Sequence, residues 1–391
     1  MTNFSTATIS AALAVAVAAS VSGVQAAGVQ SRTPGLRVPS LNPAQAVFLA
    51  IPRPMRETLF DDGHFRATLA RAGDAPPGAT VSFPSLTNGT VGAVHLTLRL
   101  DGRGEPVFDG DVQGGSWTLR NPEIARHYTW SASSPLGRVD GDFHTSPEPP
   151  RLVKIPGVPN VRDLGGWIGL DGRRVRQGMA FRSAGLNDNP DFLSVTGSDG
   201  KAVQLGWGHW EKKAGKSRLT PETCFYVTNT LGVRTDLDLR SAGEVADMTG
   251  SPAGPSVKWV HVSSSGYADI FTKWGRESFA RCFRLFLDER NYPIVFHCIG
   301  GQDRTGTLAM VLNGVLGVSE EDLCKDWMAT AFQNPEIGWF NYSKRYAPCL
   351  ERFRKERGST FTEKAELYIL SCGFTRSDIE RFRSIMLESA P

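Results

Sequence analysis

Apolar and polar residues alternate along several short segments in the first half of the chain. The pattern is clearest at 94–100, where every second residue is Val or Leu and the residues between are His, Thr and Arg. Similar runs follow at 116–119, 127–130 and 140–145, each bounded by turn residues. A period of two residues is typical of strands with one buried face. We therefore predict a small antiparallel, sandwich-like all-β domain at residues 55–148.

In the second half of the chain, a helical period alternates with shorter strand-like runs. The run at 257–262 is strand-like, and the helical runs are 277–289, 308–315 and 375–387. Strands that alternate with helices predict an α/β domain with a central sheet flanked by helices, which we place at 151–391 after the Pro-Glu-Pro-Pro run at 147–150. By strand rhythm alone, the first domain is similar in style to fibronectin type III or immunoglobulin modules.

The N-terminal end has the pattern of an export signal. Residues 11–27 are almost all small and apolar, and the Val-Gln-Ala run at 24–26 is typical of a cleavage site. We predict a signal peptide at 1–27 and export to the periplasm or the extracellular space. A plain N-terminal tail is the alternative, because residues 1–10 contain no Lys or Arg. Residues 28–54 are Pro-rich and aperiodic, which predicts a linker.

Composition sets several classes of function aside. With 391 residues and a 40% hydrophobic content, the chain is long enough for two packed domains, and no run beyond the N-terminus favours stable membrane insertion. A net charge of +3 is small for this length, so we expect no nucleic acid as a partner. The six cysteines match no zinc-binding spacing, and we expect no metal and no cofactor. In an exported protein, one or two disulfides could form among five of these cysteines.

Candidate chemistry is concentrated at 295–307, which reads Val-Phe-His-Cys-Ile-Gly-Gly-Gln-Asp-Arg-Thr-Gly-Thr. An apolar run leads into Cys298, a glycine-bearing loop follows, and Arg304 closes the loop where a helical pattern begins. Such a loop turns backbone N–H groups toward one point, and the dipole of the following helix adds positive charge there. An anion, above all a phosphate, is the expected ligand. The other residues expected to contact it are Ile299, Gly300, Gly301, Gln302 and Gly306.

Cys298 and Arg304 would act on that phosphate from two sides. A thiolate at the floor of the loop faces phosphorus, while the planar guanidinium binds two oxygens. The same positive field is expected to depress the pKa of the thiol and keep it ionised near neutral pH. The predicted chemistry is covalent phosphoryl transfer to sulfur. A buried cysteine before an ordinary strand-to-helix turn is the alternative, but it leaves the glycines and Arg304 unexplained.

The run His-Cys-x-x-Gly-x-x-Arg-Thr-Gly at 297–306 resembles the signature loop of the cysteine-dependent protein tyrosine phosphatases. Two further motifs, Asn-x-Arg-Asp-Leu-Gly-Gly at 160–166 and Asp-Leu-Arg at 238–240, are similar to those of the bacterial branch of that family. The resemblance covers about 151–388 and implies the cysteine-phosphatase fold there. Gln302 departs from the pattern, because many members of this branch place a lysine at that position.

Four residues are assigned supporting roles. Thr305 is expected to donate a hydrogen bond to the sulfur and ease its departure. His297 is expected to orient the loop and tune the thiol, with core packing as the alternative. Arg162 and Asp163 either brace the loop as a structural ion pair or reach the substrate phosphate.

The leaving oxygen of a phosphate ester needs a proton donor. The resemblance implies Asp303, because the bacterial branch carries an aspartate just before the loop arginine. Asp269 is the alternative general acid, since it follows a predicted strand where other phosphatases place a mobile acid loop.

These interpretations predict a protein tyrosine phosphatase, alternatively of dual specificity, acting on a phosphorylated protein or a small phosphate monoester. The missing lysine at Gln302 favours phosphotyrosine over phosphoinositides or inositol polyphosphates, the substrates of a phytase-like enzyme. An inactive phosphate-binding module would usually have lost Cys298 or Arg304. A rhodanese or thiol oxidoreductase would also use one reactive cysteine, but the Arg-Thr-Gly closure is against both, and the sequence has no Cys-x-x-Cys pair.

Overall fold

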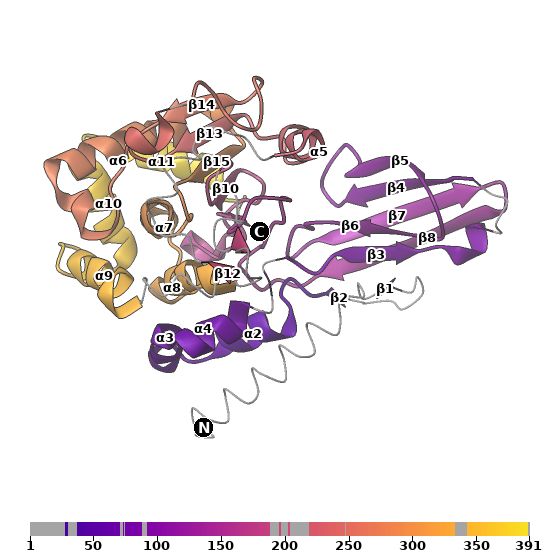
Figure 1. Ribbon diagram of the computed structural model, residues 1–391, viewed down its shortest axis with the longest axis horizontal. Coiled ribbons are helices and arrows are strands. Elements are labelled where there is room, and N and C mark those ends of the chain that lie inside the picture. Colours follow the sequence, from indigo (N-terminus) through magenta and orange to yellow (C-terminus); the bar gives the residue numbers. More distant parts are fainter. Residues whose placement is uncertain are drawn as a thin grey trace.

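A computed structural model describes residues 37–70, 73, 75–87, 92–187, 219–246, 248–332 and 342–389, together with the short strands Gly28–Val29, Val195–Thr196 and Ala202–Val203 (Figure 1). The predicted signal peptide at 1–27 lies outside the described residues. Among the helices that the structure describes, none combines the length and the apolar character needed to cross a membrane.

Two sheets make up a β-rich region. The larger has the order β2-β8-β7-β4-β5, with bounds Arg37–Val38 (β2), Gly137–Thr145 (β8), His127–Ser134 (β7), Val94–Leu100 (β4) and Phe108–Val112 (β5). The smaller has the order β1-β3-β6, with bounds Gly28–Val29 (β1), Ala79–Ser82 (β3) and Ser116–Leu119 (β6). Every second residue of β4 is buried, which confirms the predicted alternation. Both sheets contribute to one apolar core.

The C-terminal half is an α/β unit on a five-stranded sheet of order β14-β13-β15-β10-β9, which confirms the mixed α/β prediction. The parallel strands are Lys258–His261 (β14), Thr235–Asp238 (β13), Ile294–His297 (β15) and Ala180–Ser183 (β10), and the antiparallel edge strand is Arg162–Asp163 (β9). The helices are Pro221–Phe225 (α5), Lys273–Phe286 (α6), Asp303–Val315 (α7), Glu320–Met328 (α8), Tyr346–Arg354 (α9), Phe361–Ser371 (α10) and Arg376–Met386 (α11).

The structure differs from the predicted linker and from the predicted start of the β domain. Three helices lie between β2 and β3, namely Pro43–Ala50 (α2), Arg53–Asp61 (α3) and Gly63–Ala70 (α4). The prolines that suggested an aperiodic chain stand in the first turns of α2 and α3, where their missing N–H costs nothing. Asn42 and Gln45 form a capping box that begins α2.

These three helices pack on the C-terminal half of the chain. The ring of Phe48 lies 6.1 Å from that of Phe332, and the ring of Phe60 lies 5.3 Å from that of Trp327, as centroid distances. Figure 1 shows α2, α3 and α4 beneath α8, with the β-rich region extending to the right. Residues 43–70 are therefore part of the α/β core.

The central strand β15 is buried on both faces and leads into the candidate loop. Ile294 and Phe296 pack among the helices, whereas Val295 packs in a second core on the opposite face. By the same alternation, His297 projects to the side of Val295. Cys298 follows at the C-terminal end of the strand, and α7 begins five residues later. This end of a parallel sheet is where α/β proteins bind their ligands.

Candidate active site

The loop between β15 and α7 has its carbonyl oxygens bound from outside. Cys298 O accepts from His297 Nδ1 (3.1 Å), Ile299 O from Gly185 N (2.9 Å), Gly300 O from Asn160 Nδ2 (2.7 Å) and Gly301 O from Arg182 Nη2 (2.8 Å). On either side of these four, His297 O accepts from Leu239 N at 2.8 Å, and Gln302 O accepts from Gly306 N at 2.9 Å in the first turn of α7. No hydrogen bond within the described chain takes up the N–H groups of residues 299–302. Since a peptide N–H points opposite to its C=O, these donors face the interior of the loop and form a nest for an anion.

Two glycines allow the loop to close. Gly301 has φ +68°, and a Cβ there would lie 2.4 Å from the carbonyl oxygen of Ser183 on β10. Gly306 lies in the first turn of α7, where an added Cβ would lie 2.9 Å from Cδ1 of Trp327 on α8. A side chain at either position would push the loop or α7 out of place.

A buried network braces the loop from behind. Arg162 donates from Nε to Oδ1 of Asp326 at 2.8 Å and from Nη1 to Oδ1 of Asn160 at 2.5 Å. Arg182 donates a short hydrogen bond to the other oxygen of Asp326. Asn160 and Arg182 are the side chains that hold the carbonyls of Gly300 and Gly301. Removing one partner of a buried ion pair typically costs about 3–5 kcal/mol, so the brace should hold the loop rigidly.

Asp163 fixes the turn that follows β9. Its carboxylate accepts hydrogen bonds from Arg151 at 2.7 Å, from Gly165 N at 2.8 Å and from Gly178 N at 2.7 Å. Neighbouring residues of a strand point to opposite faces, which is why Arg162 and Asp163 have different partners. Arg162 is connected to the loop through Asn160, whereas the partners of Asp163 lie outside the loop.

His297 is fully buried between two carboxylates of β13 and the loop. Its Nε2 lies 2.9 Å from Oδ1 of Asp236, while Nδ1 lies 3.1 Å from Cys298 O and 3.9 Å from Oδ1 of Asp238. Only the doubly protonated ring donates at both nitrogens. Burial opposes that charge, but Asp238 and Asp236 outweigh it and raise the pKa of His297 to about 9. The ring of His297 therefore connects β13 to the Cys298 carbonyl of the loop.

Arg304 stands in the first turn of α7 and pairs with Glu244. Its Nη1 lies 2.7 Å from Oε2 and its Nη2 3.1 Å from Oε1 of that carboxylate, a bidentate contact. Burial works against the charge, but the nearby Cys298 and the Glu244 carboxylate raise the pKa of Arg304 above its ordinary value. Each side chain of the pair is about 20% exposed.

Asp303 is the first residue of α7, and the hydroxyl of Tyr267 donates a short hydrogen bond to its Oδ1. Burial raises the pKa of this carboxyl above its ordinary value, although Tyr267, Arg345 and Arg304 act in the opposite direction. An aspartate that keeps its proton to higher pH is suited to general acid catalysis. Asp269, the alternative acid, is exposed on the 3-10 turn Tyr267–Phe271 and lacks that burial.

Two buried polar atoms of the loop have no hydrogen-bond partner in the described chain, Thr305 Oγ1 and Gln302 Oε1. The expected bond from the Thr305 hydroxyl to the sulfur is therefore not formed here. Buried polar atoms are normally satisfied, so both are open to a bound group or water. Gln302 is only 2% exposed. The position at which the sequence pattern of the family would place a lysine is therefore occupied by a buried, neutral amide.

All six cysteines are free thiols in the structure. Burial raises the pKa of the other five, to about 12 at Cys282 and Cys349 and to about 11 at Cys324. Those thiols stay protonated near neutral pH and are poor nucleophiles. Cys298 differs in its position, at the floor of the N–H nest and within the electrostatic reach of Arg304.

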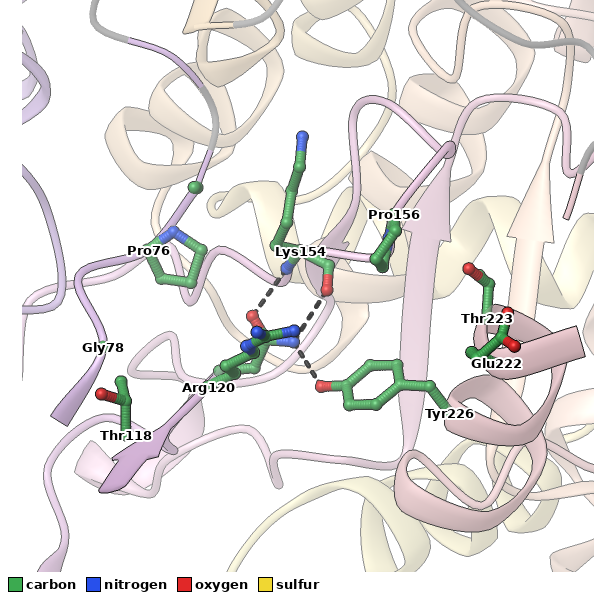
Figure 2. Close-up of a pocket in the computed structure, with 11 residues that line it drawn as sticks. Pro76, Gly78, Thr118, Arg120, Lys154, Pro156, Glu222, Thr223 and Tyr226 are labelled. Carbon is green, nitrogen blue, oxygen red and sulfur yellow. Dashed lines mark hydrogen bonds between the residues drawn. The ribbon is translucent and has the colours of Figure 1, made fainter. Parts of the chain in front are cut away.

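A cavity of about 410 Å³ lies at the junction of the two regions and shares no residue with the loop. Figure 2 shows Thr118 of the β-rich region on one side of it and Thr223 and Tyr226 of the α/β unit on the other. Asn121 donates to Lys154 O at 2.9 Å and, in a short bond, to the hydroxyl of Tyr226, and it accepts from Lys154 N at 2.7 Å. These bonds join the β-rich region to the α/β unit.

Among the described residues, the side chains spaced to hold a metal ion are His127, Asp142 and His144 on β7 and β8. None of them belongs to the loop. The chemistry of the loop itself rests on sulfur, guanidinium, carboxyl and N–H groups.

Sequence comparison extends the motifs to the whole C-terminal half. A profile described as "Tyrosine phosphatase family" matches residues 153–192 and 195–388, more than half of the chain. A curated Cupriavidus necator protein, provisionally named a tyrosine-protein phosphatase, is 27% identical over 207 residues, which are 53% of this chain and 68% of that protein. Among solved structures, a β-glucuronidase of Parabacteroides merdae aligns with 56% of this chain and 26% of its own at 11% identity, but the TM-score of 0.13 carries no argument.

Proposed function

Because the chain belongs to the tyrosine phosphatase family, we propose that it hydrolyses phosphate monoesters, first of all phosphotyrosine, through a phosphocysteine on Cys298. One observation carries the proposal: the four carbonyls of residues 298–301 accept hydrogen bonds from groups outside the loop, which leaves the N–H groups of 299–302 around the sulfur as an anion nest. An inactive binding module would need the nest but neither the thiol nor Arg304.

In the first step, the Cys298 thiolate attacks phosphorus in line with the leaving oxygen. The loop N–H groups and Arg304 hold the equatorial oxygens, where negative charge develops. The P–S bond forms as the P–O bond to tyrosine breaks. Asp303 gives its proton to the departing phenolate, while Tyr267 holds the other carboxyl oxygen in place.

In the second step, water attacks the phosphocysteine. The Asp303 carboxylate takes a proton from that water, the P–S bond breaks, and the thiolate is regenerated as inorganic phosphate forms. Thr305 can donate its unpartnered hydroxyl to the sulfur as negative charge returns there. The two steps balance with the ester and water alone.

Gln302 supports a singly phosphorylated substrate. The residue is neutral and buried, so this position offers no cation to a second phosphate. Phosphoinositides and inositol polyphosphates carry several phosphates and would gain less from this loop than a phosphotyrosine.

Phosphate release from a substrate panel tests the proposal. We expect the highest kcat/KM with a phosphotyrosine peptide, lower values with a phosphoserine peptide, a phosphatidylinositol phosphate and inositol hexakisphosphate, and no change with chelator. A preference for either inositol compound would contradict the proposed substrate class. If none of the four compounds releases phosphate, the proposed phosphatase activity is contradicted.

Export is a separate proposal, and it is supported by the small, apolar residues at 11–27. N-terminal sequencing of the mature protein tests it.

Tyr267 is expected to act as a positioning residue for Asp303. Its backbone has φ +56° and its N–H donates to Thr307 Oγ1 at 2.8 Å, so the phenol is fixed beside α7. Tyr267→Phe should lower kcat about tenfold, in line with the loss of a supporting hydrogen bond to an active group. The Tyr267 bond lowers the pKa of Asp303, so its loss should shift the alkaline limb of the pH–rate profile to higher pH.

The matched control for this variant is Tyr292→Phe. That hydroxyl donates to Phe286 O at 2.7 Å, away from the loop. Its removal should leave the position of the alkaline limb unchanged. A Tyr267→Phe profile that overlays the wild-type profile would rule out the positioning role.

A further inference from the structure

Three side chains on the outer face of the larger β sheet have donor atoms that converge. β7 and β8 are antiparallel neighbours in which His127 lies directly opposite His144. Asp142 precedes His144 by two residues and so points to the same face. The donor atoms of the three side chains all lie within 4.8 Å of one another. Strand register therefore places two imidazoles and one carboxylate at a single point.

This face of the sheet is the solvent side. The intervening residues, Tyr128 and Phe143, are buried in the apolar core, with their rings stacked at 4.9 Å. Asp142 and His144 are exposed, and His127 is half-buried. An ion in solution can reach all three side chains without any movement of the backbone.

Asp101 orients the His127 ring. Its Oδ2 lies 2.7 Å from Nδ1 of His127, and Oδ2 of Asp142 lies 3.1 Å from Nε2. When Nδ1 carries the hydrogen and donates a hydrogen bond to Asp101, the lone pair of Nε2 is directed toward the other two side chains. A carboxylate behind a histidine is the usual support of an imidazole that binds a metal. The ring of His144 stacks on that of His127 at 4.3 Å, so the two ligands lie side by side.

We propose that His127, Asp142 and His144 bind one divalent transition-metal ion of the zinc type, with Asp101 as the residue that orients His127. Two imidazoles and a carboxylate suit Zn²⁺ and its neighbours in the transition row, whereas Mg²⁺ and Ca²⁺ take oxygen ligands. Tetrahedral bonds of about 2.1 Å place donor atoms roughly 3.4 Å apart, a spacing that small rotations of these side chains can reach. Water completes the coordination.

The proposed ion is separate from the phosphatase chemistry. Its ligands belong to the β-rich region, and no step at Cys298 uses them. Because the ligands come from two paired strands, the bound ion should stabilise the folded β7–β8 pair.

Titration of the full chain with Co²⁺, a spectroscopic substitute for Zn²⁺, tests the proposal. Thiolate ligands give an intense near-ultraviolet charge-transfer band that imidazole and carboxylate ligands do not. We expect one Co²⁺ per chain, weak visible bands without the thiolate band, and displacement by Zn²⁺, in the native chain and in Cys298→Ser alike. His144→Ala should weaken binding at least about tenfold, and Asp101→Asn about tenfold.

His95→Ala is the matched control. It removes an imidazole from the same face of the same sheet, beside Asp109 at 3.2 Å and Asp111 at 3.0 Å. Its Co²⁺ affinity should equal that of the native chain. Zn²⁺ should raise the unfolding temperature of the native chain and of His95→Ala, but not of His144→Ala. The absence of saturable Co²⁺ binding, or an affinity that His144→Ala leaves unchanged, would overturn the proposal.

Discussion

Cys298→Ser is expected to reduce the turnover of a phosphotyrosine peptide at least about 10⁴-fold, because removing the nucleophile from groups that act together removes most of the rate enhancement. A serine hydroxyl in the same nest stays protonated and attacks phosphorus poorly. The substitution changes a single atom, so the loop and its braces should remain folded. Phosphate release under single-turnover conditions measures the effect.

The control for this variant is Cys224→Ser. Cys224 lies in α5 and is half-buried, and its thiol donates a long hydrogen bond of 3.7 Å to Pro252 O. Its replacement should leave turnover unchanged. If Cys298→Ser keeps more than about a tenth of the native rate, the sulfur is not the nucleophile and the mechanism is wrong.

Asp303→Asn is expected to slow the turnover of phosphotyrosine by about 10²–10⁴-fold, the usual contribution of a general acid. The loss should depend on the leaving group. A 2,4-dinitrophenolate leaves without a proton, so formation of the phosphocysteine from 2,4-dinitrophenyl phosphate should change less than about tenfold. Stopped-flow measurement of phenolate release with both substrates tests this.

The pH dependence of the same variant gives an independent test. Burial raises the pKa of Asp303, so its active, protonated form persists above the range of an ordinary carboxyl and is lost as the pH rises through the raised pKa. Native kcat should therefore fall on an alkaline limb that Asp303→Asn lacks. Asp269→Asn, at the exposed alternative, should keep both the rate and the limb. A large loss in Asp269→Asn together with an unaffected Asp303→Asn would assign the acid to Asp269.

The parts of the fold that sequence predicted are those set by local signals. The helix expected at 375–387 is α11, and Thr375 with Asp378 forms the capping box that begins it. The strand expected at 257–262 is β14. The helix expected from 277 begins earlier, at Lys273, because the Thr272 side chain caps it.

The helices α2 to α4 differ from the sequence prediction in two ways: the proline-rich character of 28–54 favoured a linker over α2, and the predicted β domain began at 55, within α3. Asn42-Pro43-x-Gln45 is a readable helix start, with a capping residue, proline in the first turn and glutamine to complete the box. The signal for α2 is the position of Pro43, directly after a capping residue, rather than the number of prolines in the segment. That these helices pack on α8 could not be predicted, because it depends on contacts such as Arg53 with Glu320 and Arg56 with Glu321, which are 267 and 265 residues apart in sequence.

At the site, the sequence predicted the groups that lie within one loop but not their distant partners. Cys298, Asp303 and Arg304 lie within seven consecutive residues of the chain. Glu244, which holds Arg304, and Tyr267, which holds Asp303, come from other segments, 60 and 36 residues away. Asp326, shared by the two bracing arginines, is 164 residues from one of them. Only the tertiary fold brings these pairs together, and no spacing pattern indicates them.

The phosphocysteine can be measured directly in Asp303→Asn with 2,4-dinitrophenyl phosphate. This substrate should phosphorylate the sulfur quickly, while the lack of a base for water should slow the second step, so the intermediate accumulates. Acid quench and peptide mass spectrometry should then find one phosphate per chain, on Cys298, together with a matching burst of dinitrophenolate. Steady release of dinitrophenolate without a burst, or phosphate bound to any other residue, would contradict covalent transfer to this sulfur.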